Sequence, residues 1–341
     1  MSQNDWQLAD KNMQYRVLNA LTKEKVWSEN TIITSQDHTL EIQLHGCLLI
    51  THFKRSSMMS RYEFEGPVIY SCGKRKTEVT SLENLIDILF QHFDIEISAQ
   101  LNNELLHSRD SFVEIYKLFS SRKHNIQASM QFSRMPMTLN FFAWLQHISD
   151  SDETDDLLYS ESLVIEGHPT HPLTKTKLPL TMEEVKAYSP EFEKMIPLKI
   201  VVLHKKYARV TTIDGDTQFI LHKVIPEYRA KIRKFAQSLH LSLEDYQVLL
   251  VHPWQYENII YDKFEKWIET QTLITTPFEV KSKATLSFRT MSLIGRPFHV
   301  KLPVNVQATS AVRTVSSVTT VDGPKLSLSL QNVLNPVSYT H

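Results

Sequence analysis

The chain has 341 residues, of which 42% are apolar, enough for two domains with a sizeable core. Its 37 Lys and Arg balance 38 Asp and Glu, so a net charge of −1 favours neither nucleic acid nor an anionic membrane as a partner. With 7 glycines, a glycine-rich phosphate loop is disfavoured. No apolar signal core or membrane-length apolar run occurs, so we expect a cytoplasmic protein. The two cysteines, Cys47 and Cys72, leave a disulfide and a reduced pair both open.

Residues 1–150 predict an N-terminal domain of mainly helical character. The first expected elements are a helix near Asp5–Lys23 and a β-rich segment Thr39–Thr51, with which Tyr62–Tyr70 could pair. A helix over Leu85–Phe93 should follow a capping box at Thr80–Glu83, and the apolar spacing is mainly helical from Leu101 to about Ile148. The polar, acidic run Ser149–Asp156 is the predicted linker. We favour a solvated loop there over a metal-binding one.

Residues 157–341 predict a second domain built on a mainly antiparallel sheet with helices. The expected elements are a capping box at Thr181–Glu184, strands at Leu198–Leu203, Gln218–His222 and Val248–Val251, an amphipathic helix over Ile225–Leu239, and mostly strands from Lys283 to the end. The predicted fold class is therefore α+β, with a helical N-terminal region followed by the sheet region.

The first segment that could carry chemistry is Glu166–Lys177, which contains His168, His171 and Lys175. Two histidines three residues apart could bind a metal from one face of a helix. Each of them precedes a proline, however, and this favours extended backbone and argues against a zinc site. Two interpretations remain: a rigid loop that offers imidazoles and lysines to an anion, or a proline-stiffened turn with surface lysines.

The second segment, His252-Pro253-Trp254-Gln255, directly follows a predicted strand. A strand end before a helix start is a common ligand position, but Trp254 could equally close a core.

The third segment, Lys283–Met291, alternates as a strand would. One side would carry Ala284, Leu286 and Phe288, and the other would carry Thr285, Ser287 and Arg289, with Thr290 at the end. Such a strand offers a guanidinium fork and hydroxyls to a phosphate. The alternative is an ordinary two-faced strand with a solvated arginine.

The fourth segment, His299–Thr314, also alternates, with Lys301 on its polar side and Arg313 near its end. A turn at Gly295–Pro297 would make a hairpin that places Ser287 and Arg289 beside Lys301. Converging cations of this kind suit a triphosphate or a polycarboxylate. The sequence contains no P-loop, no His-Glu-x-x-His, no nucleophile elbow and no Cys-x-x-Cys.

In this order, the four segments resemble the IucA/IucC family of siderophore synthetases, which work without a peptide-synthetase template. The matching blocks are Gly167-His168-Pro169-Thr170-His171-Pro172 with Lys175, His252-Pro253-Trp254-Gln255, Ser287-x-Arg289-Thr290, and Lys301-Leu302 followed by Thr309-Ser310-Ala311-x-Arg313-Thr314. The resemblance runs from about Glu166 to Leu334 and is less distinct before it.

This resemblance implies an ATP-dependent ligase with Mg²⁺. ATP would adenylate a carboxylate of citrate or a related polycarboxylic acid, with release of pyrophosphate, and an amine or amino-alcohol would then displace AMP. The implied ATP contacts are His168, Ser287, Arg289, Thr290 and Lys301. Thr309 and Arg313 would hold the acid, and Arg289, Lys301 and Arg313 would be catalytic. His171 and Lys175 would shape the first loop.

The chain departs from the family pattern in two ways. The family's Lys-x-Arg-x-Gly is replaced by Lys175-Thr176-Lys177-Leu178-Pro179, and Lys does not equal Arg in a bidentate contact. Family members are also nearly twice as long, with a cupped-hand architecture of thumb, fingers and palm. We therefore expect residues 1–150 to be thumb-like and 157–341 fingers-like, with the palm and its Mg²⁺ ligands absent and an abrupt end at Asn335–His341. A full-length form could be a homodimer.

Three hypotheses follow for the chain. It belongs to a functional ligase, or it is a truncated, inactive fragment that acts at most as a partial ATP- and carboxylate-binding module, or it is a structural protein with a chance motif.

Overall fold

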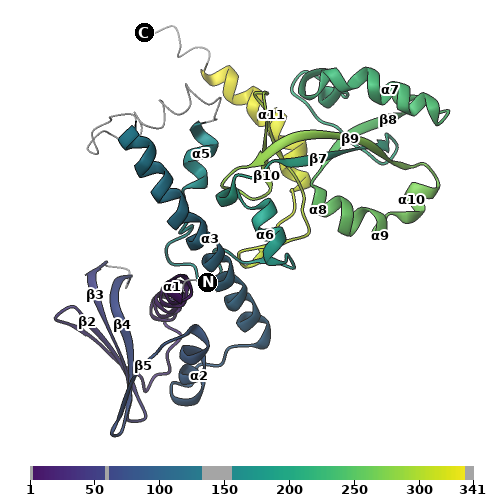
Figure 1. Ribbon diagram of the computed structural model, residues 1–341. Coiled ribbons are helices and arrows are strands. Elements are labelled where there is room, and N and C mark those ends of the chain that lie inside the picture. Colours follow the sequence, from purple (N-terminus) through teal and green to yellow (C-terminus); the bar gives the residue numbers. More distant parts are fainter. Residues whose placement is uncertain (1–2, 58–60, 133–155, 335–341) are drawn as a thin grey trace. The chain divides into compact units, whose positions relative to one another are not determined.

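A computed structural model describes residues 3–57, 61–132 and 156–334, and Figure 1 shows the course of the chain. The chain divides into two compact units. The first contains Met1–Thr154, Leu163–Lys186 and Gln307–Ala311, and the second contains Asp155–Ser162, Ala187–Val306 and Val312–His341. The predicted linker lies outside the described residues, apart from Asp156. We describe each unit separately, and the fold class is α+β with antiparallel sheets, as predicted.

A five-stranded antiparallel sheet with its strands in chain order forms one half of the first unit. Its strands are β1 (Ile32–Gln36), β2 (Thr39–Leu44), β3 (Cys47–Ser56), β4 (Tyr62–Cys72) and β5 (Arg75–Glu78). The predicted pairing of Thr39–Thr51 with Tyr62–Tyr70 is confirmed through β3 and β4, in which Leu49 lies opposite Tyr70. The segment Thr39–Thr51 also turns once on itself, at His45 and Gly46, which both have positive φ.

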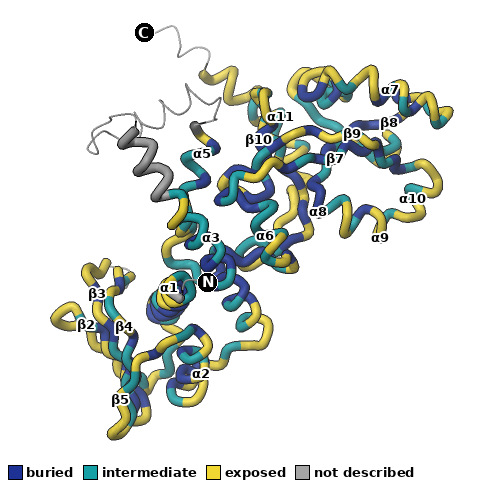
Figure 2. Tube along the Cα trace, in the orientation of Figure 1, coloured by how far each residue is buried: buried dark blue, intermediate teal, exposed yellow. Residues whose placement is uncertain are grey.

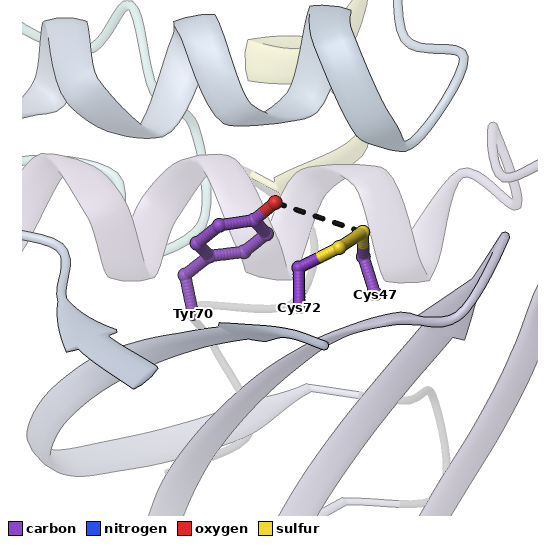
Figure 3. The surroundings of a disulfide bond; sticks show 3 residues. All are labelled: Cys47, Tyr70 and Cys72. Atoms are coloured by element: carbon purple, nitrogen blue, oxygen red, sulfur yellow. Dashed lines mark hydrogen bonds between the residues drawn. A yellow bond between two sulfur atoms is a disulfide. The ribbon is translucent and has the colours of Figure 1, made fainter. Parts of the chain in front are cut away.

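A disulfide joins Cys47 and Cys72, which lie directly opposite each other on β3 and β4 (Figure 3). Their Cα atoms are 4.2 Å apart, and the hydroxyl of Tyr70 donates a hydrogen bond to the Cys47 sulfur at 3.6 Å. Strand register therefore accounts for the pairing of two residues that are 25 positions apart in the sequence.

Three helices cover this sheet and complete the core of the first unit. They are α1 (Gln3–Lys23), α2 (Leu82–His92) and α3 (Ala99–Phe132). Helix α2 is capped one residue later than the predicted box at Thr80–Glu83, because the Ser81 hydroxyl accepts a hydrogen bond from the Asn84 amide at 3.1 Å. Fully buried side chains from the helices and the sheet meet in one cluster, which includes Met13, Leu18, Leu40, Leu89, Phe93 and Phe112.

The rest of the first unit consists of short elements. Strand β6 (Lys177–Leu178) pairs antiparallel with β12 (Gln307–Ala308). Helix α6 (Met182–Tyr188) has the predicted capping box, in which the Thr181 amide donates to Glu184 at 2.8 Å and the Glu184 amide donates to the Thr181 hydroxyl at 3.3 Å. Strand β13 (Ala311–Val312) lies where the chain passes from the first unit to the second.

The second unit is built on another five-stranded antiparallel sheet, in the order β11-β10-β9-β7-β8. Its strands are β7 (Ile196–His204), β8 (Tyr246–Val251), β9 (Leu273–Ala284), β10 (Thr290–Leu293) and β11 (His299–Lys301). Much of β7 and β8 is buried (Figure 2), and the strands predicted at Leu198–Leu203 and Val248–Val251 are confirmed. The strand predicted at Gln218–His222 is wrong, since a π-helical turn, η2 (Ile220–Val224), occupies its place. The Asp216 carboxylate lies just before this turn, accepting from the Gln218 amide at 2.9 Å and bonding to the His222 ring.

Helices surround the second sheet. They are α5 (Asp156–Ser162), α7 (Arg229–Ser238), α8 (Pro253–Gln255), α9 (Tyr261–Lys263), α10 (Glu265–Glu269) and α11 (Ser317–Leu334), with short turns at η1 (Pro190–Phe192), η3 (Pro226–Tyr228), η4 (Leu243–Asp245) and η5 (Tyr256–Ile260). Helix α7 with η3 confirms the helix predicted over Ile225–Leu239.

The prediction of strands to the end of the chain is wrong for α11. The Ser316 hydroxyl accepts from the Thr319 amide at its start, and α11 exposes its apolar residues (Figure 2). Within the described part of the chain, no helix is both long and apolar enough to cross a membrane.

His252 joins β8 to α8 and is completely buried. Its Nδ1 accepts a hydrogen bond from the Trp254 amide at 3.2 Å, so the ring is neutral with its proton on Nε2. The ring packs edge-on against Tyr188 and at a tilt against Phe288. Burial lowers the pKa of His252 to about 4. Trp254 is also buried, so it closes a core, in line with the second interpretation of this segment.

Replacement of His252 by Asn should change the pH dependence of stability. The folded-state pKa lies below the unfolded value, so protonation of the unfolded chain should remove stability as the pH falls from 6.5 towards 4. The wild type should lose about 3 kcal/mol of unfolding free energy in this window relative to the variant. Asn retains an N-cap acceptor but does not titrate. Urea unfolding at both pH values measures the difference, and parallel pH profiles would contradict it.

Candidate functional site

The predicted site residues are divided between the two units. The first unit contains His168, His171, Lys175 and Thr309, and the second contains Ser287, Arg289, Thr290, Lys301 and Arg313. Each group is described within its own unit.

In the second unit, Ser287 and Arg289 lie in a tight turn between β9 and β10. The prediction of one continuous strand over Lys283–Met291 is therefore wrong, since β9 ends at Ala284 and pairs antiparallel with β10. The Thr285 amide donates to the Thr290 carbonyl at 2.9 Å, and the Thr285 hydroxyl donates to the Ser287 carbonyl at 3.2 Å. Hydroxyl-to-backbone bonds compete with strand pairing and account for this turn.

The predicted hairpin between the third and fourth segments is confirmed. Strands β10 and β11 are antiparallel, with Thr290 directly opposite Lys301 and Gly295 in the connecting turn at a φ of +70°. The Thr290 hydroxyl donates to the Ser287 hydroxyl at 3.3 Å. The hydroxyls of Ser287 and Thr290 and the exposed ammonium group of Lys301 therefore belong to the same end of the hairpin.

The long strand predicted after His299 is wrong beyond Lys301, where β11 ends. Pro303 has no amide hydrogen to donate to a ladder, which explains the early end. The predicted alternation of side chains is nevertheless present in this stretch. Leu302, Val304 and Val306 are buried, while Lys301, Pro303 and Asn305 are exposed.

Arg289, in this turn, contacts Arg313. Arg289 is 8% exposed, and its Nη1 donates to the main-chain carbonyl of Arg313. Its own carbonyl accepts from the Leu302 amide at 2.8 Å, which fixes the turn to the segment after β11. Burial, and then the nearby Arg313 charge, lower the pKa of Arg289. Among the described residues, no carboxylate lies within ion-pairing distance of Arg289, Lys301 or Arg313.

A cavity of 320 Å³ in the second unit adjoins Arg313. Its other polar lining residues are Gln255, Lys263, Asn305 and Thr314, and its apolar wall comprises Ile259, Phe264, Pro303, Val304 and Val312. The Gln255 side-chain oxygen accepts from the Asn305 amide at 2.8 Å. Gln255 is the last residue of the motif that directly follows a strand, and Asn305 lies on the polar side of the fourth segment, whereas no sequence signal pointed to Lys263.

In the first unit, each histidine of Gly167–Pro172 stabilises its own loop. The His168 Nδ1 accepts from the Thr170 amide at 3.4 Å, and the His171 Nδ1 accepts from the Leu173 amide at 3.1 Å. The two rings are nearly perpendicular, with centroids 6.2 Å apart. Among the described residues, no group of three or more His, Cys, Asp or Glu converges as a metal site.

Lys175 and Lys177 are both buried, so the interpretation as a turn with surface lysines is wrong. The Lys175 ammonium group donates to the Val164 carbonyl at 3.3 Å. Thr309 lies close to this segment, since its amide donates to the Thr176 carbonyl at 3.1 Å and Ala308 pairs with Lys177. The first unit therefore brings Thr309 to the segment that follows the histidine loop, whereas Arg313 belongs to the second unit.

Gly167 has a φ of +61°, and a Cβ there would lie 2.5 Å from the Thr174 hydroxyl oxygen, which accepts from the His168 amide. We expect Gly167→Ala to destabilise the first unit by about 1–3 kcal/mol more than Gly73→Ala. Gly73 is the matched control because its φ is +60° and its Cβ would meet nothing within 4 Å, so both variants share the backbone strain. Denaturant unfolding measures the difference, and equal losses would exclude crowding at Gly167.

Relatives of known function match most of this chain over part of their own length. Staphyloferrin A synthase of Staphylococcus aureus (strain NCTC 8325 / PS 47) is 58% identical over 331 residues, which are 97% of this chain and 57% of that protein. D-ornithine–citrate ligase of the same organism is 32% identical over 183 residues, 53% of this chain and 28% of that protein. The chain thus spans little more than half the length of the first relative.

Solved structures share the fold. The petrobactin biosynthesis protein AsbB from Bacillus anthracis str. Sterne superposes with a TM-score of 0.70 at 19% identity, over 98% of this chain and 52% of that one. ATP-bound aerobactin synthetase IucA from a hypervirulent pathotype of Klebsiella pneumoniae gives 0.62 at 17% identity, over 90% and 51%. The sequence profile of the IucA/IucC family matches residues 156–340, more than half of the chain. The chain therefore belongs to the IucA/IucC family.

Proposed function

We propose that this chain provides the nucleotide- and acid-binding part of an ATP-dependent ligase of siderophore biosynthesis. The reaction joins a carboxylate of citrate, or of a related polycarboxylic acid, to an amine or amino-alcohol. This proposal extends the activities named for staphyloferrin A synthase and D-ornithine–citrate ligase to this chain. Because the reaction consumes ATP, we assign it to the cytoplasm.

One observation carries the proposal: Arg289 and Arg313 lie together without a carboxylate partner among the described residues. Holding a partly buried guanidinium beside a second cation is unfavourable unless an anion binds there. The Ser287 and Thr290 hydroxyls and the Lys301 ammonium group belong to the same hairpin end. Guanidinium, ammonium and hydroxyl groups are the donors that bind phosphates and carboxylates.

The proposed chemistry uses these cations twice. A carboxylate oxygen of the acid attacks the α-phosphorus of ATP, and the bond to the bridging oxygen breaks to release pyrophosphate. The amine nitrogen then attacks the acyl carbon, AMP leaves and the nitrogen loses its proton. In the first step two anions approach each other, so fixed positive charge beside the α-phosphate lowers the barrier. We assign this role to Arg289, Lys301 and Arg313, with Thr309 as a further contact of the acid.

We assign contacts with the ATP phosphates or ribose to the side chains of Ser287, Thr290 and His168. We assign a loop-shaping role to His171 and Lys175. Buried Lys175 with its carbonyl partner supports that loop role. When bound with the ATP phosphates, Mg²⁺ would neutralise part of their charge.

In a chain extended by the remaining residues of staphyloferrin A synthase, Arg289→Ala and Arg313→Ala should each lower ATP–pyrophosphate exchange with citrate by on the order of 10²-fold or more, because each removes a charge partner of the transition state. The matched control is Arg296→Ala on the same hairpin. Arg296 pairs with Glu227 and donates to the Val224 carbonyl, so its loss should leave exchange within about threefold of the wild type. Unchanged exchange in both site variants would refute the assignment.

A second candidate function is ATP and acid binding without turnover, which the Arg289 and Arg313 pair would support equally. The two candidates separate in one experiment with citrate, Mg²⁺, ATP and a diamine. Pyrophosphate release supports the ligase. Saturable ATP binding without release, with release restored in a version extended by the relative's remaining residues, supports the binding module. Neither binding nor release in either version would exclude both.

A further inference from the structure

One buried arginine in the first unit, Arg16 on α1, contacts the segment that carries His168. Its side chain is 4% exposed, whereas that of its partner Glu166 is 51% exposed. Nη2 donates to the Glu166 carbonyl and to the Glu166 carboxylate, both at 2.8 Å, and Nη1 donates to the main-chain carbonyl of His168. Nε donates to the Asn12 side chain at 3.0 Å, and the guanidinium lies over the Phe112 ring with its carbon 4.9 Å from the centroid. One planar group therefore bonds on both sides of Gly167.

Two further side chains hold the Glu166 carboxylate in place. The Tyr116 hydroxyl on α3 donates to one oxygen at 2.9 Å, and the Asn12 amide on α1 donates to the other at 3.0 Å. The Asn12 amide also contacts the Tyr116 hydroxyl at 2.6 Å. Burial, and then the charge of Glu166, raise the pKa of Tyr116 well above its usual value, so it remains a donor. We call Arg16, Asn12, Tyr116 and Glu166 the Arg16 clamp.

Arg16 is one of several groups that hold the backbone around Gly167. Gly167 is in the left-handed region, and the loop after it is closed by bonds from the His168 amide to the Thr174 hydroxyl at 2.9 Å, from the His171 amide to the His168 carbonyl at 3.4 Å and from the Thr174 amide to the His171 carbonyl at 3.2 Å. The His168 ring itself is exposed, accepts from the Thr170 amide at 3.4 Å and lies edge-on to the His171 ring. Of the two bonds to the His168 carbonyl, the one from Arg16 is the shorter and comes from outside the loop.

We propose that Arg16 is a positioning residue: through the Arg16 clamp it fixes the Gly167–Thr174 loop so that His168 presents its imidazole to the nucleotide. The part that concerns the nucleotide rests on the proposed function. The fork geometry is essential, since the guanidinium satisfies four acceptors in one plane and an ammonium group on a flexible stem cannot reach all of them.

The test is Arg16→Lys, with Arg109→Lys as the matched control. Arg109 is also a buried arginine of the first unit, lies over the Trp6 ring and pairs with Asp10, Glu83 and Asp110, none of which belongs to the loop. Hydrogen exchange should show the amides of His168, Leu173 and Thr174 exchanging at least about tenfold faster in Arg16→Lys and at the wild-type rate in Arg109→Lys. ATP binding, measured by calorimetry with Mg·ATP, should weaken by about tenfold in Arg16→Lys alone.

Tyr116→Phe provides a second variant in case Arg16→Lys fails to fold, because it removes one bond to Glu166 and leaves the arginine in place. It should accelerate loop exchange in the same direction by a smaller factor. Unchanged loop exchange in both variants, or equal acceleration in Arg109→Lys, would overturn the positioning role. If the wild type binds no ATP, the proposed function fails, while loop exchange still decides whether the clamp exists. The link to the nucleotide would be overturned by a third result. In that case the wild type binds ATP, and Arg16→Lys accelerates loop exchange without weakening ATP binding.

Discussion

The charge balance around Arg289 is the constraint on which the second unit's site depends. Its guanidinium is largely buried, its nearest charged neighbour is Arg313, and the described residues provide no carboxylate to neutralise it. The fold holds it there by main-chain bonds: the Arg289 carbonyl accepts from Leu302, and its guanidinium donates to the Arg313 carbonyl. In the proposed site, these cations are in place before any ligand arrives, as electrostatic preorganisation requires.

Two buried arginines of the first unit, by contrast, are paired with carboxylates. Arg16 is neutralised by Glu166, and Arg109 by Asp10, Glu83 and Asp110. These arginines also lie over aromatic rings, which favours a desolvated cation. Because carboxylates already neutralise these arginines, they attract a ligand only weakly. Their side chains instead order the backbone around them. The pairing of Arg16 and Arg109 with carboxylates indicates a structural role. The lack of such a partner for Arg289 and Arg313 among the described residues makes those two available for binding.

The sequence predicted the elements whose signals are local. Thr181 starts its helix as expected, Ser81 caps α2 one residue after the predicted box, and the strands predicted at Leu198–Leu203 and Val248–Val251 are found in β7 and β8. The hairpin that opposes Thr290 to Lys301 was also within reach, because Gly295 supplies the positive φ of its turn. The turn at Thr285–Arg289 was not, because side-chain hydroxyls replace strand pairing there without disturbing the polar and apolar alternation.

By itself, the sequence determined the family pattern, the α+β class and the identity of the charged residues, since motif order, periodicity and composition depend on the chain alone. Tertiary structure decided their environments. Lys175 and Lys177 became buried, His252 lost contact with water, and Arg16 met Glu166 from 150 positions away. Burial, desolvation and long-range pairing depend on which elements pack together, and no local signal near Arg16 or Glu166 specifies that packing.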